Sequence, residues 1–210
     1  MEQQNIARHI VTLAQRVKSL SQNGLLYSTN EYDTDRYNEL SRIANELLSD
    51  VSGQTPEQIA ESFPPEDDYV TPKVDIRAAV FDTEGRILLV RERDGLWSVP
   101  GGWADVGYSP REVAVKEVKE ETGLDIRPVR LIAVHDKKCH AHPPATHYAY
   151  KILILCEIVG GEMSTAFDIL DRGFFAVDAL PPLSEERILK EQIDLMVKCR
   201  KNNHFEAQID

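Results

Sequence analysis

Three glutamates crowd the stretch KEVKEETG, at positions 117, 120 and 121. On a helix, residues three and four apart share one face, so the three carboxylates would point the same way. Like charges at these spacings destabilise a helix, and something should offset the repulsion. Clustered carboxylates are the ligands that hard divalent cations such as Mg2+ and Mn2+ prefer. The spacing of Glu117, Glu120 and Glu121 therefore favours a metal site.

A second interpretation of the same residues is a solvated helix face. Lys116 and Lys119 alternate with the glutamates and would reduce their repulsion. The flanking residues favour the metal site instead. Because Gly101 and Gly102 lack side chains, the main chain can approach the glutamates there, and its carbonyls could complete a ligand shell.

The residues from 102 to 124 resemble the Nudix box, G-x5-E-x7-R-E-U-x-E-E-x-G-U, in which U is a bulky apolar residue. The positions in register are Gly102, Glu117, Val118, Glu120, Glu121, Gly123 and Leu124. Two positions depart, since Tyr108 replaces the first glutamate of the box and Lys116 replaces its arginine. In the family these two residues mainly brace the loop against the helix. The departures leave the metal site intact and put the brace in question.

The resemblance implies an α/β fold, a Nudix α/β/α sandwich with a mixed sheet, over about residues 72–200. It also implies metal-dependent hydrolysis of the diphosphate bond in a nucleoside diphosphate linked to a group X. Glu117 and Glu121 are then the first metal ligands, with Mg2+ or Mn2+ as the ion. Glu120 is a third ligand or holds a metal-bound water, and the Gly102 carbonyl is a further ligand.

The identity of the general base stays open in this comparison. In the family it is a glutamate of the box, here Glu120 or Glu121, or an acid from a later loop. The stretch STAFDILDRGFF supplies Asp168 and Asp171 just before a predicted strand. An ordinary loop role is the alternative for both aspartates.

Four of the six histidines and Cys139 lie in residues 135–151, HDKKCHAHPPATHYAYK. The spacing of Cys139, His140 and His142 is not that of the paired ligands of a structural zinc site. We expect instead a proline-stiffened loop in which His140, His142 and Tyr148 contact the substrate. A polar hairpin loop without that role is the alternative.

The elements that must position these residues fall into two parts. Residues 1–66 form a predicted helical module, and residues 67–210 form the predicted α/β domain. Helices are expected from residue 3 to the glycine at 24, from about residue 33 to 49, and from the TPEQ capping signal at 55–58. The acidic, proline-rich residues 63–72 read as a linker.

Beyond the linker the apolar period changes to that of strands. Strands are expected at 74–81 and 86–92 around a DTEG turn, and at about 129–136, 147–158 and 173–177. Helices are expected at 110–122, where Gly123 ends the helix, and at about 184–199. The Gly160–Gly161 pair is expected to separate a strand from a loop.

The composition restricts the partners. The 210 residues carry a formal charge of −11, and so acidic a surface repels nucleic acid and anionic membranes. No apolar run has the length of a membrane span, and three unpaired cysteines suit a reducing cytoplasm. We therefore expect a cytoplasmic enzyme with a small-molecule substrate.

The helical module resembles the extension that precedes the Nudix domain in a bacterial group of hydrolases of X-linked nucleoside diphosphates. The stretch NGLLYSTNEYDTDRYNEL, residues 23–40, carries this likeness. It favours CDP-choline, split to CMP and phosphocholine, with ADP-ribose as the alternative substrate. Action on RNA ends and a non-catalytic nucleotide sensor are further alternatives, which the charge and the intact glutamates disfavour.

The first helix predicts an assembly. Ile6, Ile10, Leu13, Val17 and Leu20 recur at helical spacing and form one apolar face. Short helices cannot bury such a face on each other alone. We expect a homodimer in which the module lies at or near the subunit contact.

Overall fold

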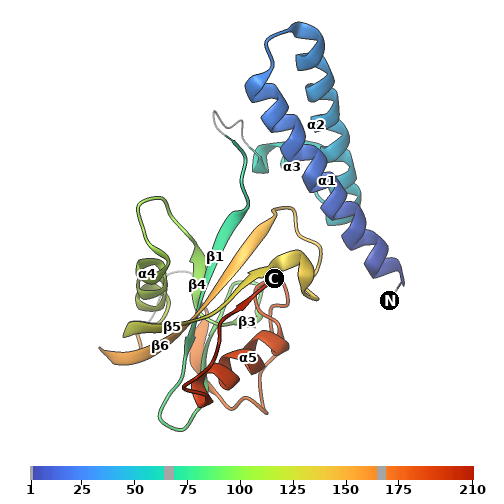
Figure 1. Cartoon of the computed structure of the whole chain (residues 1–210). Coiled ribbons are helices and arrows are strands. Elements are labelled where there is room, and N and C mark those ends of the chain that lie inside the picture. The colour runs from blue at the N-terminus through green and yellow to red at the C-terminus, as the bar shows by residue number, and fades with distance from the viewer. Residues whose placement is uncertain (1, 64–68, 165–168) are drawn as a thin grey trace. The chain divides into compact units, whose positions relative to one another are not determined.

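The computed structural model of the chain describes residues 2–63, 69–164 and 169–210. The chain divides into two compact units (Figure 1). The helical unit comprises Met1–Pro72 and the short segment Pro143–Tyr148, and the α/β unit comprises Lys73–His142 and Ala149–Asp210. The predicted fold class, a Nudix α/β domain preceded by a small helical module, is confirmed.

Three helices build the helical unit: α1 (Glu2–Tyr27), α2 (Glu31–Ser52) and α3 (Pro56–Ser62). Asn30 caps α2 and accepts a hydrogen bond from the Asp33 N–H, and Gly53 ends the helix in the left-handed conformation. The predicted capping box opens α3, where Thr55 and Gln58 satisfy each other's backbone N–H groups. The predicted linker at 63–72 lies partly outside the described residues.

The prediction that Gly24 ends the first helix was wrong, since α1 continues to Tyr27. Gly24 lies inside α1 for a packing reason. A Cβ atom added there would lie 2.3 Å from the ring of Tyr37 on α2. The glycine therefore permits the close approach of two helices, which local sequence reading cannot distinguish from a helix end.

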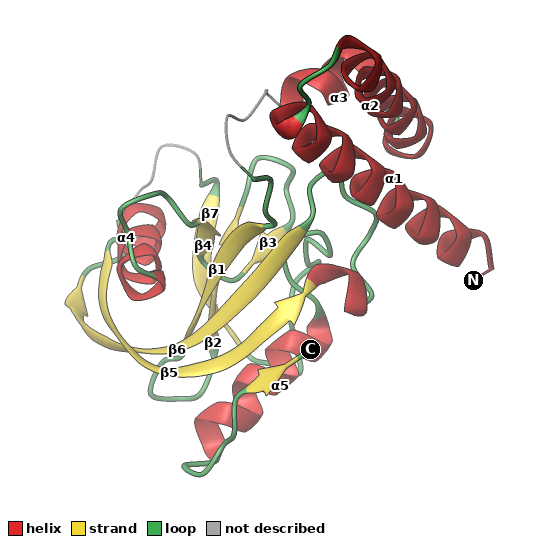
Figure 2. Ribbon diagram, turned by 45° about the horizontal axis from the view of Figure 1, so that its top comes forward, coloured by secondary structure: helices red, strands yellow, loops and turns green. Residues whose placement is uncertain are grey.

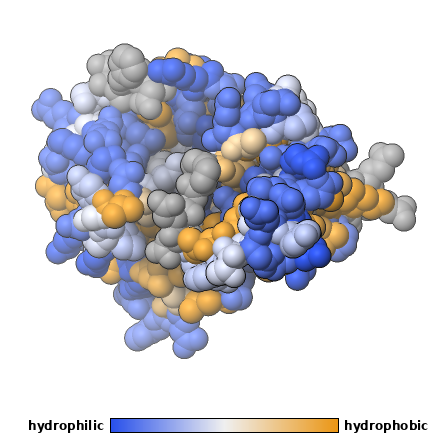
Figure 3. Space-filling model, turned by 90° about the horizontal axis from the view of Figure 1, so that it is seen from above, coloured by the Kyte–Doolittle hydropathy of each residue, from blue (hydrophilic) through white to orange (hydrophobic). Residues whose placement is uncertain are grey.

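The predicted apolar face of α1 is not the face that this unit buries. Val11 and Ala14 are buried with Leu48 and Ile59 of α2 and α3. Ile6, Leu13 and Leu20 remain 55%, 41% and 64% exposed in the single chain. Figure 3, which looks down on the molecule from above, shows apolar side chains at the surface between polar ones.

The segment 143–148, which joins two strands of the α/β unit, belongs to the helical unit. Gln15 of α1 donates from Nε2 to the carbonyl oxygens of Ala145 and Thr146, at 2.8 and 3.1 Å. The Thr146 hydroxyl donates to Gln54 Oε1 at 3.2 Å. This assignment was not predicted from the sequence.

The α/β unit contains two sheets. A five-stranded sheet has the order β4 (Gly101–Trp103), β1 (Lys73–Val80), β6 (Ala149–Gly161), β5 (Leu124–Asp136) and β8 (Gln208–Ile209). A three-stranded sheet has the order β3 (Trp97–Ser98), β2 (Ile87–Arg91) and β7 (Asp171–Phe175). The first sheet is mixed, because β1 runs parallel to β6 and antiparallel to β4.

Two helices cover this unit, α4 (Pro110–Thr122) on one side and α5 (Lys190–Lys201) on the other (Figures 1 and 2). A short 3-10 helix, η1 (Lys137–Cys139), follows β5. One apolar cluster packs α4 against β1, β5 and β6, and a second gathers the residues of α5. Among the described residues, no helix combines the length and the hydropathy that a membrane crossing requires.

The structure corrects several predicted boundaries. β5 begins at Leu124, directly after α4, and β6 includes both Gly160 and Gly161 instead of ending before them. α5 begins at Lys190, since residues 185–187 form a turn and residues 188–189 are not helical. The short strands β4 and β8 were not predicted, because two or three residues give no periodic signal.

Candidate functional site

The helix that carries the three glutamates is fixed at both ends. Ser109 caps α4 and forms a capping box with Glu112, and Pro110 occupies the first turn. The Glu112 carboxylate is therefore held by Ser109, at 2.7 and 2.8 Å, and not by Lys116. Gly123 ends the helix with a φ of 81°. Glu117, Glu120 and Glu121 thus fall in the last two turns, as predicted.

The glycine pair lies in β4, beside these glutamates. Gly101 has a φ of 145°, and a Cβ atom there would lie 2.0 Å from the Ile76 carbonyl oxygen of β1. A Cβ atom at Gly102 would lie 3.0 Å from the carboxylate of Glu117. The absence of a side chain at Gly101 therefore lets β4 lie close to β1, and its absence at Gly102 leaves room for the Glu117 carboxylate.

Glu121 is the most enclosed of the three carboxylates. Its Oε2 accepts a hydrogen bond from the Gly101 N–H at 3.0 Å. Burial raises the pKa of Glu121 to about 8, against the opposing effects of Arg77 and the Gly101 N–H. The negative charges of Glu117 and Glu92 raise it further. A carboxylate in this position needs additional positive charge to ionise at neutral pH.

Glu120 points to a different environment. Its side chain is 60% exposed and forms an ion pair with Lys116 at 3.1 Å, whereas the side chain of Glu117 is 16% exposed. The three carboxylates, all among the described residues, do not converge within 4.8 Å of one another as a set. Glu117 and Glu121 are therefore the best placed of the predicted ligands.

Lys116, which replaces the arginine of the box, lies among acidic groups. Its Nζ is 3.2 Å from Glu117, 3.1 Å from Glu120 and 3.6 Å from Asp105. Hydrogen bonds to the two glutamates raise the pKa of Lys116. The half-exposed Tyr108 lies in the loop before α4, and no described hydrogen bond joins it to Lys116. The lysine thus offsets the repulsion of the glutamates.

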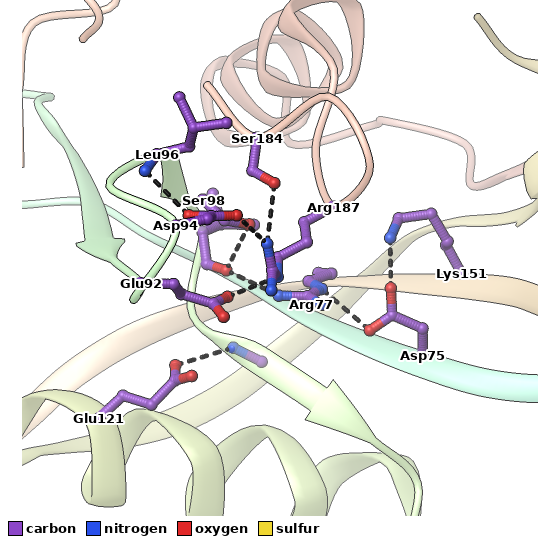
Figure 4. A network of polar contacts seen from close by, with 12 residues as sticks. Asp75, Arg77, Glu92, Asp94, Leu96, Ser98, Glu121, Lys151, Ser184 and Arg187 are labelled. Carbon is purple, nitrogen blue, oxygen red and sulfur yellow. Dashed lines mark hydrogen bonds and ion pairs between the residues drawn. The ribbon is translucent and has the colours of Figure 1, made fainter. Parts of the chain in front are cut away.

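A buried ionic network lies behind the glycine pair (Figure 4). Asp75 and Arg77 are two apart on β1 and face the same way, with Asp75 Oδ1 accepting from Arg77 Nε at 2.9 Å. Lys151, opposite Asp75 on β6, bonds the other carboxylate oxygen. Burial alone would raise the pKa of Asp75, but Arg77 and Lys151 hold it below its usual range. Arg77 also donates to the Val99 carbonyl at 3.3 Å and so holds the main chain shortly before the glycine pair.

Sequence reasoning missed this network and its neighbours Glu92 and Arg187. Glu92 follows β2 and bonds Arg187 Nε at 2.8 Å, and Arg187 also reaches Asp94 at 2.8 Å (Figure 4). Glu92 and Arg77 both affect the pKa of Glu121, so they belong to its surroundings. The available signal was the pair of charged residues in the otherwise apolar stretch VDIRAAV.

These residues fit a divalent cation. The buried Glu121 carboxylate has an N–H donor and a nearby guanidinium, yet its pKa remains raised. Glu117 approaches the β4 main chain so closely that a methyl group at Gly102 would disturb it. Two partly enclosed carboxylates beside an accessible main chain form an oxygen-rich donor set of the kind that Mg2+ and Mn2+ prefer.

Of the two aspartates predicted as candidate bases, Asp168 and Asp171, the latter has no described contact with the glutamates. Asp168 lies outside the described residues. Asp171 is the first residue of β7, is exposed, and lies 3.5 Å from Arg91. A base role for either aspartate stays a prediction.

His140 and His142 lie in different surroundings within the α/β unit. His142 is buried and its Nδ1 lies 2.6 Å from the Glu185 carbonyl oxygen. Burial lowers the pKa of His142 to about 3. His140 faces Glu191 and Asp210, while Tyr148 belongs to the helical unit. Substrate contact by these residues stays a prediction.

Two protein families match this chain, one over each part of it. The "NUDIX domain" family matches residues 71–195, and the family described as "UDP-X-like, N-terminal oligomerisation domain" matches residues 8–63. A putative ADP-ribose pyrophosphatase of Bacillus subtilis strain 168, YjhB, is 44% identical over 184 residues, which are 87% of this chain and 88% of that protein.

Two solved structures are also similar. The crystal structure of a UDP-X diphosphatase is 35% identical, covers 97% of this chain and 99% of its own, and has a TM-score of 0.63. That of an ADP-ribose pyrophosphatase from Streptococcus suis 89-1591 is 44% identical, covers 67% of this chain and 100% of its own, and has a TM-score of 0.62. The NUDIX match spans more than half of the chain, over the strands and the helix that build the glutamate site. The chain therefore belongs to the Nudix family of hydrolases.

Proposed function

We propose that this protein is a metal-dependent diphosphatase that cleaves a nucleoside diphosphate linked to a group X. The observation that carries the proposal is the enclosed pair of carboxylates, Glu117 and Glu121, against the glycine main chain of β4. Glu117, Glu121 and the Gly102 carbonyl would hold Mg2+ or Mn2+. Such an ion neutralises the diphosphate and lowers the pKa of an attacking water.

The residues of the chain supply position and proton transfer. The Gly101 N–H orients the Glu121 carboxylate. Arg77 donates to the Val99 carbonyl and so holds the main chain that leads into β4. Lys116 holds Glu120 at the exposed side of the site, where that carboxylate can accept a proton from water. Glu120 is therefore our first candidate for the base, although Glu121 and Asp168 remain alternatives to be tested by substitution.

The substrate is proposed from the relatives. CDP-choline is the expectation from the N-terminal extension, but two of the similar proteins are named ADP-ribose pyrophosphatases, one of them as putative. On the strength of these names we favour ADP-ribose over CDP-choline, and the "UDP-X-like" description of residues 8–63 adds UDP-linked compounds as candidates. A hydrolysis screen over these compounds and RNA ends, with Mg2+, with Mn2+ or with a chelator, tests the proposal. Activity on none of them with either ion would contradict it.

We also propose that the protein forms a homodimer through the helical unit. The apolar face of α1 is exposed in the single chain, and the family matched over residues 8–63 is described as an oligomerisation domain. A symmetric contact of this face with its copy would bury the exposed side chains. We propose that this dimeric enzyme is cytoplasmic.

A further inference from the structure

A second group of potential metal ligands lies far along the sheet from the glutamates. His135 is near the end of β5, His140 follows η1, and Asp210 follows β8. One ligand atom from each lies within 4.8 Å of the other two. The two imidazole rings stack with centroids 4.0 Å apart, and His140 Nε2 is 3.0 Å from Asp210 Oδ2. The cluster combines two imidazoles with one carboxylate.

The backbone holds the three residues in this arrangement. β8 pairs with the end of β5, with Ile209 opposite Val134, and the Asp210 N–H bonds the Val134 carbonyl at 3.4 Å. The Asp136 N–H donates to Asp210 Oδ2 at 2.8 Å. The strand pairing therefore brings residues 135 and 210 together although 75 positions separate them in the chain.

Two residues in the first turn of α5, Glu191 and Gln192, contact the two imidazoles. His140 Nδ1 is 3.3 Å from Glu191 Oε1, on the opposite edge of the ring from Asp210. Metal-bound histidines usually direct their second nitrogen to a carboxylate in this way, which fixes the tautomer. The Gln192 amide nitrogen lies 3.4 Å from His135 Nδ1.

We propose that His135, His140 and Asp210 bind one transition-metal ion of the zinc class, at a site separate from the glutamates. Imidazole ligands suit Zn2+, Co2+ and Ni2+, whereas Mg2+ prefers an all-oxygen set. Three protein ligands leave a fourth position for water in tetrahedral coordination. β4, beside the glutamates, and β8 form opposite edges of the five-stranded sheet. The ion would fasten β8 and η1 to the end of β5.

Titration of the intact protein with Zn2+ in excess Mg2+ tests the proposal. The Mg2+ competes for the glutamates, and calorimetry reports the remaining Zn2+ site. We expect one equivalent of Zn2+ to bind the wild-type protein and to raise its melting temperature. His140→Ala and Asp210→Asn should each weaken this binding by roughly tenfold or more, because each removes a ligand. Asp210→Asn keeps the size of the side chain, so it decides the matter should His140→Ala fail to fold.

Two controls separate this site from other sources of binding. His204→Ala removes an exposed histidine of the same C-terminal region and should leave Zn2+ affinity unchanged. Glu117→Gln should also leave it unchanged, which keeps the test independent of the proposed hydrolase site. In nitrogen–proton correlation spectra, the imidazole signals of His135 and His140 should shift on Zn2+ addition while that of His204 does not.

The opposite results would overturn the proposal. Absence of Zn2+ binding in excess Mg2+ would show that His135, His140 and Asp210 only form hydrogen bonds that hold β8 in place. Unchanged Zn2+ affinity in folded His140→Ala or Asp210→Asn protein would place any bound ion elsewhere. Loss of the binding in Glu117→Gln would assign the ion to the glutamates.

Discussion

At the scale of single residues, the carboxylates on α4 differ in their surroundings more than in their spacing. Glu121 is enclosed and has a raised pKa, Glu117 occupies the space that a side chain at position 102 would need, and Glu120 pairs with Lys116 near the surface. A helix face alone makes them equivalent. The differences arise from β4 and β1, and they predict different effects of substitution.

Glu117→Gln and Glu121→Gln should each reduce Mg2+-dependent turnover by a factor on the order of 100, because each removes a charge from the proposed ion site. Folding should survive, and the melting temperature of metal-free Glu121→Gln should be unchanged or higher, since the substitution removes a buried carboxyl group whose ionisation the site opposes. Turnover and thermal unfolding measure the two effects. Glu157→Gln, which alters an exposed pair with Arg127, is the control. Near-normal activity in both site variants would refute the assignment.

His142 predicts a pH dependence of stability. Its pKa in the folded protein is about 3, below the value near 6.5 expected in the unfolded chain. Between these values the unfolded state binds one more proton, so the free energy of unfolding falls as the pH falls through this range. The contribution is fully present above about pH 6.5, with a slope of at most about 1.4 kcal/mol per pH unit below it.

Denaturant unfolding at several pH values would measure this slope. His142→Gln should flatten it, while His204→Gln should not, because His204 is exposed. Equal slopes in the wild type and in His142→Gln would show that the buried imidazole does not control acid stability.

At the scale of elements, the site depends on how closely β4 can approach both β1 and α4. Gly101 meets the backbone of Ile76, and Gly102 meets the flexible carboxylate of Glu117. A backbone atom cannot move aside as a carboxylate can, so the two glycines should respond differently to the same substitution. This difference separates the stability of the sheet from the geometry of the site.

Gly101→Ala should destabilise the protein by more than about 2 kcal/mol, because its Cβ would lie 2.0 Å from the Ile76 oxygen at a φ of 145°. Gly102→Ala should remain folded but lose turnover by roughly tenfold or more, because it displaces Glu117. Denaturant unfolding and turnover distinguish these outcomes. The control is Gly95→Ala, which has a φ of 81° but no atom within 4 Å and should cost only about 1 kcal/mol. A fully active Gly102→Ala protein would argue against the close approach.

At the scale of the whole molecule, the exposed face of α1 is the feature that a single chain leaves unexplained. Val11 and Ala14 already bury one side of the helix within its unit. Ile6, Leu13 and Leu20 form a second apolar side that a partner would have to cover. Leu40 and Ile43 of α2 are also partly exposed, at 38% and 40%.

Leu13→Glu combined with Leu20→Glu should convert the proposed dimer to a monomer, because two buried charges per subunit would replace apolar contacts. Light scattering measures the mass, and circular dichroism checks that the helices remain. Asn38→Glu introduces a charge at an exposed polar position of α2 and should leave the mass unchanged. A double variant that keeps the mass of the wild type, or a wild type that is already monomeric, would exclude this face as the dimer contact.

The sequence by itself determined the parts of this protein that depend on short spacings. The signal at Gly123 set the end of α4, and the three-and-four spacing put Glu117, Glu120 and Glu121 on its face. The Nudix resemblance over these same residues identified the family before any fold was known. Residues three and four apart on a helix lie on the same face, so neighbours along a helix can be predicted from a short stretch of sequence.

Only the tertiary structure decided which residues surround those glutamates. Arg77 comes from β1 and Glu92 from the end of β2, and the partner of Asp75 is Lys151, 76 positions away. His135 meets Asp210, and the segment 143–148 binds Gln15, for the same reason. Such pairs depend on strand order and packing, which no local period specifies, because a strand can pair with any strand whose apolar face matches.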